Sequence, residues 1–152
     1  RKAAEQNKPP AQFNLAILFY LGDDVPKDLK ETAKWMTRAA EQGEAASQNT
    51  LAVLYYNGEG VEKNMEEAIK WWRRSAENGN SKAQVSLGAM YYDGKGVAKD
   101  MAQALKWHYI SIENGSDDAK QNRDTLEKEA TPEQISTAKK LSDEWMKEHC
   151  LR

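Results

Sequence analysis

Few residues of this chain have the type and spacing that catalysis or metal binding needs. His108 and His149 are the only histidines, and neither stands at ligand spacing from a second histidine or a partner carboxylate. Cys150 is the only cysteine, so it cannot form an internal disulfide, and it leaves the redox compartment undecided. The sequence therefore predicts no catalytic residue, no metal site and no cofactor.

Two short motifs suggest chemistry that their context does not support. Gly58-Glu59-Gly60 and Gly94-Lys95-Gly96 resemble pieces of phosphate-binding loops, but no predicted strand precedes them. Trp71-Trp72-Arg73-Arg74 combines aromatic and basic residues, as nucleic-acid stacking platforms do. However, Trp35, Trp71 and Trp107 recur 36 residues apart, and the net charge is −2. We therefore predict turn glycines, structural roles for Trp71 and Trp107, and no binding of nucleic acid.

The residues best suited to binding form a stripe that recurs every 36 residues. One copy comprises Asn49, Val53, Tyr56 and Asn57, at i, i+4, i+7 and i+8 of a predicted helix. A solvated helix face is normally charged, whereas this stripe is apolar and aromatic. It either lines a concave groove that binds a partner or is buried between neighbouring repeats. The groove interpretation assigns the following partner-binding residues: Phe13, Ile17, Tyr20, Asn49, Val53, Tyr56, Asn57, Val85, Tyr92 and Asp93.

The same 36-residue period defines the helices that must position this stripe. In one copy Ser47, Leu51, Leu54 and Tyr55 form an apolar face at helical spacing. Gly58 follows and can end that helix, because glycine readily adopts the left-handed conformation of a C-terminal cap. Asn64, or Asp100 one period later, can cap the next helix. Each copy is therefore predicted to be a pair of helices.

Stacking such pairs predicts an all-α, right-handed α-solenoid of antiparallel helix pairs. The repeats are expected at 11–43, 47–79 and 83–115, followed by a C-terminal cap at 116–152, all in one repeat domain, 1–152. Residues 1–7 align with 37–43, so we expect them to be the end of a preceding repeat and the chain to come from a longer protein. The expected helices are 11–20, 28–42, 46–56, 64–78, 82–92, 100–114 and a capping helix at 132–148.

The third copy resembles the Sel-one-like repeat (SLR), a relative of the tetratricopeptide repeat. The residues that carry the resemblance are Ala83, Leu87, Gly88, Tyr91, Gly94, Gly96, Val97, Asp100, Ala104, Trp107 and Gly115. The second copy departs at Ala52 and Asn64, and the first at Phe19, Asp24 and Thr32. Asp24 replaces a loop glycine, and we expect it to adopt the left-handed conformation that aspartate tolerates.

The resemblance implies a bacterial, non-catalytic scaffold or adaptor that binds a protein or peptide. An alternative is a secreted or envelope-associated virulence or immunity-type factor that binds through its convex face or loops. The resemblance slightly favours the periplasm or secretion over the cytoplasm. No apolar run approaches the ~20 residues of a membrane span, so we expect no membrane insertion. The oligomeric state is open, with a monomer favoured.

Overall fold

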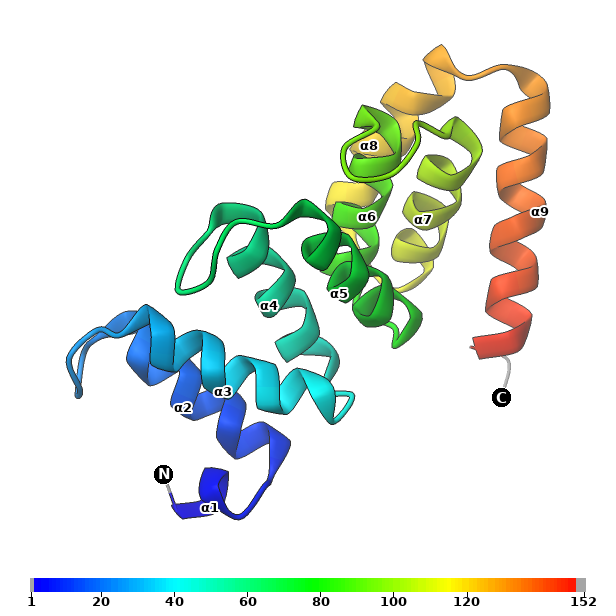
Figure 1. Ribbon diagram of the computed structural model, residues 1–152. Coiled ribbons are helices and arrows are strands. Elements are labelled where there is room, and N and C mark those ends of the chain that lie inside the picture. Colours follow the sequence, from blue (N-terminus) through cyan, green and yellow to red (C-terminus); the bar gives the residue numbers. More distant parts are fainter. Residues whose placement is uncertain (1, 150–152) are drawn as a thin grey trace. The chain divides into compact units, whose positions relative to one another are not determined.

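The computed structural model describes residues 2–149, except for the side chain of Ala3. Cys150 therefore lies outside the described residues. Within them the chain forms α-helices and no strand, as the sequence predicted (Figure 1). The chain divides into two compact units with their boundary between Asn78 and Gly79.

Unit 1 contains α1 (Lys2–Glu5), α2 (Pro9–Leu21), α3 (Leu29–Glu41), α4 (Ala45–Asn57) and α5 (Met65–Glu77). Helices α2 and α3 form one antiparallel pair, α4 and α5 form the next, and α3 packs against α4 (Figure 1). The core of this unit includes Leu15, Met36, Leu51 and Leu54, which are buried. The apolar face predicted from the period thus holds the helices of this unit together.

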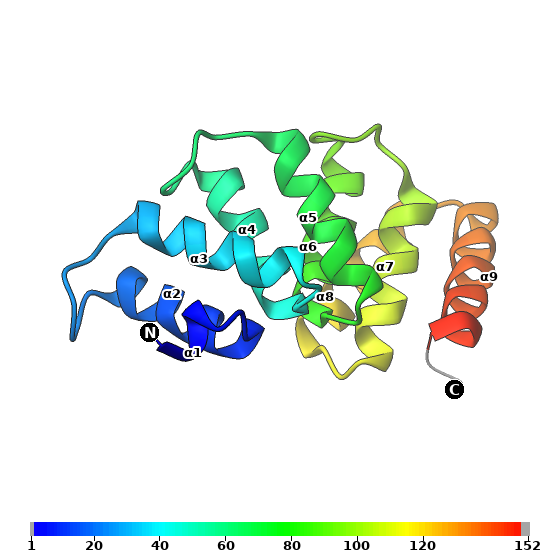
Figure 2. The same ribbon diagram turned by 60° about the horizontal axis from the view of Figure 1, so that its bottom comes forward.

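Unit 2 contains α6 (Ser81–Asp93), α7 (Met101–Glu113), α8 (Asp117–Glu129) and α9 (Pro132–His149). Helix α7 packs against all three other helices of the unit, as both ribbon views show (Figure 2). Ala104 and Leu105 of α7 form a buried cluster with Leu126 of α8 and Ala138 of α9. The predicted capping helix is therefore present as α9.

The helix ends follow from local capping. Both ends of each predicted helix lie within two residues of the ends of an observed helix. The Asn64 Oδ1 accepts a hydrogen bond from the Glu67 N–H at 3.1 Å, and the Asp100 Oδ1 accepts one from the Gln103 N–H at 3.0 Å. Gly58 ends α4 with a φ of 72°, in the left-handed region. Side-chain acceptors thus satisfy backbone N–H groups at the starts of α5 and α7, and a glycine ends α4, as predicted.

Two local features differ from the sequence-based expectations. Helix α8 was not predicted, because only Ala119 and Leu126 of its residues are buried and its apolar periodicity is weak. Asp24 was expected to be left-handed, but Asn7 is the only described non-glycine residue with a positive φ. That expectation is wrong. The second repeat needs Gly60 at this loop position, since a Cβ there would collide with the Leu29 carbonyl.

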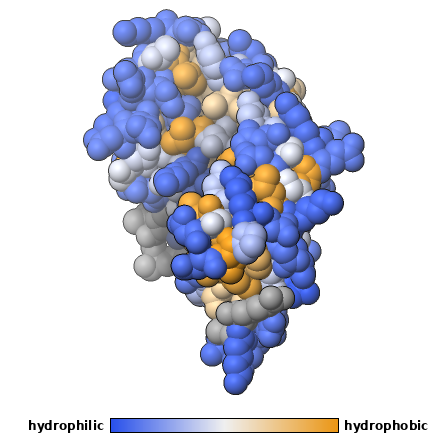
Figure 3. Space-filling model, turned by 90° about the vertical axis from the view of Figure 1, so that its left-hand side faces the viewer, coloured by the Kyte–Doolittle hydropathy of each residue, from blue (hydrophilic) through white to orange (hydrophobic). Residues whose placement is uncertain are grey.

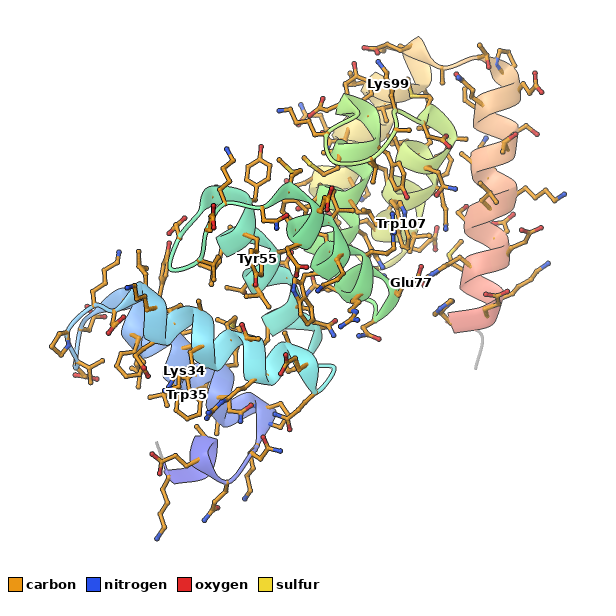
Figure 4. The ribbon with its side chains drawn as sticks, viewed as in Figure 1. Lys34, Trp35, Tyr55, Glu77, Lys99 and Trp107 are labelled. Carbon is orange, nitrogen blue, oxygen red and sulfur yellow. The ribbon has the colours of Figure 1, made fainter. Side chains whose placement is uncertain are left out.

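The recurring tryptophans belong to the fold. Trp35, Trp71 and Trp107 are all buried, as predicted for structural residues. Figure 4 shows Lys34 beside Trp35 on α3, where the Lys34 ammonium lies 5.4 Å from the ring centroid and the Arg38 guanidinium 4.7 Å. The Lys34 and Arg38 cations therefore lie between the otherwise buried Trp35 ring and the solvent.

Candidate functional site

A cavity of about 270 Å³ opens between α2, α3 and α4, and we call it the unit 1 groove. Leu54, Met36 and Thr32 contribute buried side chains to its lining. Tyr20 and Val53 also line it, and each is 37% exposed. The remaining lining residues are Ile17, Asn49, Thr50, Asn57 and Glu59. The groove is therefore an apolar hollow with accessible walls.

The structure brings five of the ten predicted binding residues together in this groove: Ile17, Tyr20, Asn49, Val53 and Asn57. Tyr56 is half-buried and packs against Trp72 of the same unit, with ring centroids 5.5 Å apart. Phe13 and Val85 are half-buried, and Asp93 is exposed. The stripe is thus exposed in some places and packed into the fold in others.

The face drawn in Figure 3 is largely hydrophilic, interrupted by apolar patches. Among the residues that the structure describes, the exposed large apolar ones are Leu18, Tyr20, Leu21 and Val53, all in unit 1. Tyr20 and Val53 line the groove, whereas Leu18 and Leu21 are not among its lining residues. The latter pair therefore supplies matched controls of similar chemistry on the same unit.

Each recurring tyrosine of the stripe carries a lysine on its ring. The Lys27 ammonium lies 5.1 Å from the centroid of Tyr20, and the Lys99 ammonium lies 5.1 Å from that of Tyr92. Lys63 occupies the same position over Tyr56, at 6.0 Å. These lysines also recur every 36 residues. The aromatic face that each lysine covers is thus already engaged with a cation.

The polar groups of the unit 1 groove differ in how they are satisfied. Thr50 donates its hydroxyl to the Ala46 carbonyl at 2.9 Å, within its own helix. The Asn57 amide donates to the Glu59 carboxylate at 2.7 Å. The Asn49 Oδ1 is buried and has no hydrogen-bond partner. A buried acceptor without a donor is costly, so the Asn49 oxygen, which the surrounding protein encloses, is a local cost to the fold.

Residues of unit 2 occupy the positions equivalent to those that line the groove, two repeat periods further on. There Tyr92 takes the place of Tyr20, and Glu129 of α8 takes the place of Asn57. The Tyr92 hydroxyl donates to the Glu129 carboxylate at 2.7 Å, which raises the pKa of Tyr92 above its usual value. Tyr92 also packs against the cluster of Ala104, Leu105 and Leu126. In unit 2 the stripe tyrosine is therefore hydrogen-bonded to helix α8 and packed against it.

A recurring glutamine that the sequence analysis overlooked joins the helices of each unit. The Gln48 Nε2 donates to the Ala40 carbonyl at 3.0 Å, and its Oε1 accepts from the Asn78 Nδ2 at 2.9 Å. The equivalent amide pairs are Gln12 with Gln42 and Gln84 with Asn114. Their 36-residue spacing was the available signal. These buried amides are structural and lie outside the groove.

His108 is buried against Gly88, where an added Cβ would lie 3.0 Å from the His108 Nε2. Burial lowers the pKa of His108 from 6.5 to about 4, so the imidazole is neutral at pH 7. Its Nδ1 has no hydrogen-bond partner. In the described part of the chain no three acidic, histidine or cysteine side chains gather at a possible metal site. His108 is accordingly a packed core residue.

A second cavity, of about 170 Å³, lies in unit 2 between α7, α8 and α9. Charged residues of both signs line it, namely Glu113, Arg123, Lys139 and Asp143. Tyr109, also in the lining, donates its hydroxyl to Glu127 at 2.7 Å, and burial raises its pKa. The mixed charges give this cavity no preference for an anion or a cation. No helix in the described residues has the length and apolar character to cross a membrane.

Paired helices repeated at a fixed period define a helical-repeat protein, and comparison with known proteins identifies the kind. The Sel1 repeat family model matches residues 9–44, 45–80 and 81–116. The chain belongs to the Sel1 repeat family. Repeats of this family generally mediate protein–protein interactions, and the fold is typically a non-catalytic scaffold.

Solved structures share this fold. A Sel1 repeat protein from Oxalobacter formigenes is 36% identical with a TM-score of 0.76, over 78% of this chain and 49% of its own. The protective antigen c5321 of uropathogenic Escherichia coli, with an SLR fold, is 30% identical with a TM-score of 0.76, over 98% of this chain and 40% of its own. Helicobacter pylori cysteine rich protein B is 25% identical with a TM-score of 0.65, over 79% and 92%. The chain thus spans half or less of the first two. No curated protein matches it.

Proposed function

We propose that this chain is an adaptor that binds a peptide or protein segment. The contact is the predicted stripe on the first helix of each repeat, with the unit 1 groove as the principal contact. The observation that carries the proposal is the convergence of Ile17, Tyr20, Asn49, Val53 and Asn57 on one open apolar cavity. Large apolar side chains on a surface are typical of interaction sites when they gather around a hollow. Tyrosine suits such a site because its ring contributes apolar area at low entropic cost.

The residues of the predicted stripe differ in what their substitution would test. Tyr20 and Val53 are accessible, so their loss removes contact area with little loss of core packing. Tyr56 packs on Trp72 and Tyr92 is bonded to Glu129, so changing either would also disturb the fold. The informative variants are therefore Tyr20→Ala and Val53→Asp, with Leu21→Ser as the control. Leu21 is 56% exposed and is not among the groove-lining residues.

The test is to capture a partner on the immobilised chain, purify that partner and titrate it against each variant by calorimetry. Truncating an interface anchor typically costs about 2 kcal/mol, which corresponds to roughly 30-fold in affinity. We expect a loss of this size for Tyr20→Ala and a larger one for Val53→Asp, with unchanged melting temperatures. Leu21→Ser should bind within about twofold of the parent chain. Unchanged affinity in both groove variants would exclude the groove as the binding site.

A second candidate function is a secreted or envelope-associated binding factor that acts through the convex face or the loops. The observation that favours it is the similarity to c5321, which is described as a protective antigen. This function would need exposed residues outside the groove, such as Leu21 or the lysines that follow α2, α4 and α6, namely Lys27, Lys63 and Lys99. The titration above separates the two functions, because binding that is lost in Leu21→Ser and kept in Tyr20→Ala would support the second.

A further inference from the structure

Helix α2 carries an exposed apolar face outside the unit 1 groove, which we call the Leu18–Leu21 face. Leu18 is 38% exposed and Leu21 is 56% exposed. One repeat period later, the position of Leu18 is held by Leu54, which is only 2% exposed. Leu54 is buried because α4 packs against the helix pair before it, formed by α2 and α3. Leu18 therefore occupies a position that is part of a helix–helix interface in the next repeat.

The side chains of α2 also suit a buried helix. Its sequence, PPAQFNLAILFYL, contains no charged residue. A helix face that remains in water normally carries charged or polar side chains, whereas a helix that is apolar on most sides is normally buried. Leu21 makes the exposed face more apolar than its counterpart on α4, where Asn57 holds the same position. The face thus favours an apolar occupant over water.

Helix α1 already makes the first contact of such an interface, as Figure 1 shows for α1 and α2. The Gln12 Nε2 donates to the Ala4 carbonyl at 3.1 Å, just as the Gln48 Nε2 donates to the Ala40 carbonyl at 3.0 Å. Ala4 and Ala40 are equivalent in the repeat, and each is 1% exposed. Helix α1 therefore meets α2 in the way that the end of α3 meets α4.

The backbone at the end of α1 matches the end of α3 as well. Asn7 has a φ of 64° and Gly43, one period later, has a φ of 90°, so both are left-handed. The Asn7 N–H donates to the Ala4 carbonyl at 3.1 Å, and the Gly43 N–H donates to the Ala40 carbonyl at 3.0 Å. Asparagine is one of the few residues besides glycine that adopt this conformation readily. Helix α1 thus has the geometry of the last turn of the second helix of a pair.

We infer that the Leu18–Leu21 face of α2 is a docking surface for a further helix pair of the same repeat type, whose second helix ends in α1. The α3–α4 interface shows what this pair presents. There α4 meets apolar side chains from both helices of the pair before it, including Ile17 of α2 and Met36 of α3. In a helical-repeat array each such interface adds to the stability of its neighbours. The inference concerns a different surface from the unit 1 groove and does not depend on the proposed function.

The test compares the 152-residue chain with a version that carries the missing pair. A copy of residues 9–36 is placed before residue 1, because residues 1–7 align with 37–43 and complete the added pair. Leu18→Ser is made at the original position in both proteins, and urea denaturation gives the folding equilibrium constant. We expect the loss in this constant to be at least about tenfold larger in the extended protein, where Leu18 becomes buried. Val53→Ser is the matched control, because Val53 is 37% exposed and keeps the same neighbours in both proteins.

Two results would overturn the inference. The first is an equal loss for Leu18→Ser in the two proteins, which would mean that the added pair does not cover the face. The second is a dimeric 152-residue chain in sedimentation that Leu18→Ser makes monomeric, which would assign the face to a second copy of the chain. A larger loss for Leu18→Ser in the extended protein, with equal losses for Val53→Ser, supports the inference.

Discussion

At the scale of the residue, His108 shows how one repeat position accepts different side chains when its neighbour changes. Met36 and Trp72 occupy the same position in the first two repeats, opposite Ala16 and Ala52. In the third repeat His108 lies against Gly88, which has no side chain to compete for the space. This imidazole is buried without a partner for Nδ1, so its protonation is opposed by desolvation.

This burial makes the stability of the protein sensitive to mild acid. The pKa of His108 is about 4 in the folded chain and 6.5 when unperturbed, so the unfolded chain takes up the proton first as the pH falls. The stabilisation is complete above pH 6.5 and is lost between pH 6.5 and 4. We expect His108→Met to reduce the loss of unfolding free energy between pH 7 and pH 5 by about 2 kcal/mol. Urea denaturation at both pH values measures it, and parallel pH profiles for the two proteins would contradict the prediction.

The candidate site shows what recurrence in the sequence can and cannot reveal about single residues. The period placed Tyr20, Tyr56 and Tyr92 at one helix position, and this is correct. Their environments differ because non-repeating residues set them. Trp72 covers Tyr56, Glu129 binds Tyr92, and Tyr20 has neither. The unpaired oxygen of Asn49 depends on packing between three helices, which sequence spacing does not report.

At the scale of the element, amide hydrogen bonds connect neighbouring helices in addition to the packing of the apolar stripe. Gln48 of α4 joins the last turn of α3, through the Ala40 carbonyl, to Asn78 at the end of α5. Removing Gln48 would break both hydrogen bonds at once, although the Ala40 carbonyl still accepts the Gly43 N–H and Asn78 is exposed. A typical intramolecular hydrogen bond contributes about 0.5–1.5 kcal/mol to stability.

We therefore expect Gln48→Met, which keeps the shape of the side chain, to lower the unfolding free energy by about 1–3 kcal/mol. Asn78→Leu should cost less, because Asn78 is exposed and Gln48 keeps its bond to Ala40. In a double-mutant cycle measured by chemical denaturation, the double variant should be more stable than the sum of the single losses implies. Strict additivity would show that the two amides act independently.

Helix α8 explains why element prediction succeeded at six stacked helices and at α9 but missed one. Each stacked helix carries a leucine or a tryptophan at one periodic core position, whereas α8 has Arg123 where α2, α4 and α6 have leucine. Its signals were polar ones: Ser116 caps it at Ala119 N–H, and Asp117 and Asp118 occupy its first turn. Its packing against α7, through Leu126, is a tertiary effect. Apolar periodicity alone therefore underestimates helices at the end of an array.

At the scale of the whole molecule, the two units contain helix pairs of the same kind but differ in the surroundings of the stripe tyrosine. In unit 2 the tyrosine of the stripe is tied down by Glu129, an acidic residue on the helix that follows the pair. In unit 1 the equivalent residue of α4 is Asn57, whose amide turns to Glu59 instead. The side chain at this one position thus decides whether the stripe tyrosine has an acidic hydrogen-bond partner. A substitution at Asn57 can therefore test the difference between the units.

The exchange is Asn57→Glu, which gives Tyr20 the acidic partner that Tyr92 has. We expect the new carboxylate to accept a hydrogen bond from the Tyr20 hydroxyl and to draw the ring across the groove, which should lower affinity for the protein partner by at least about tenfold. The new hydrogen bond would match the one between Tyr92 and Glu129, and two-dimensional NMR of the tyrosine rings would detect it. Asn57→Gln, which adds length without charge, is the matched control and should leave both measurements near those of the parent. Unaltered binding with this hydrogen bond formed would mean that Tyr20 can be held in place without closing the groove, and that the partner does not contact Tyr20.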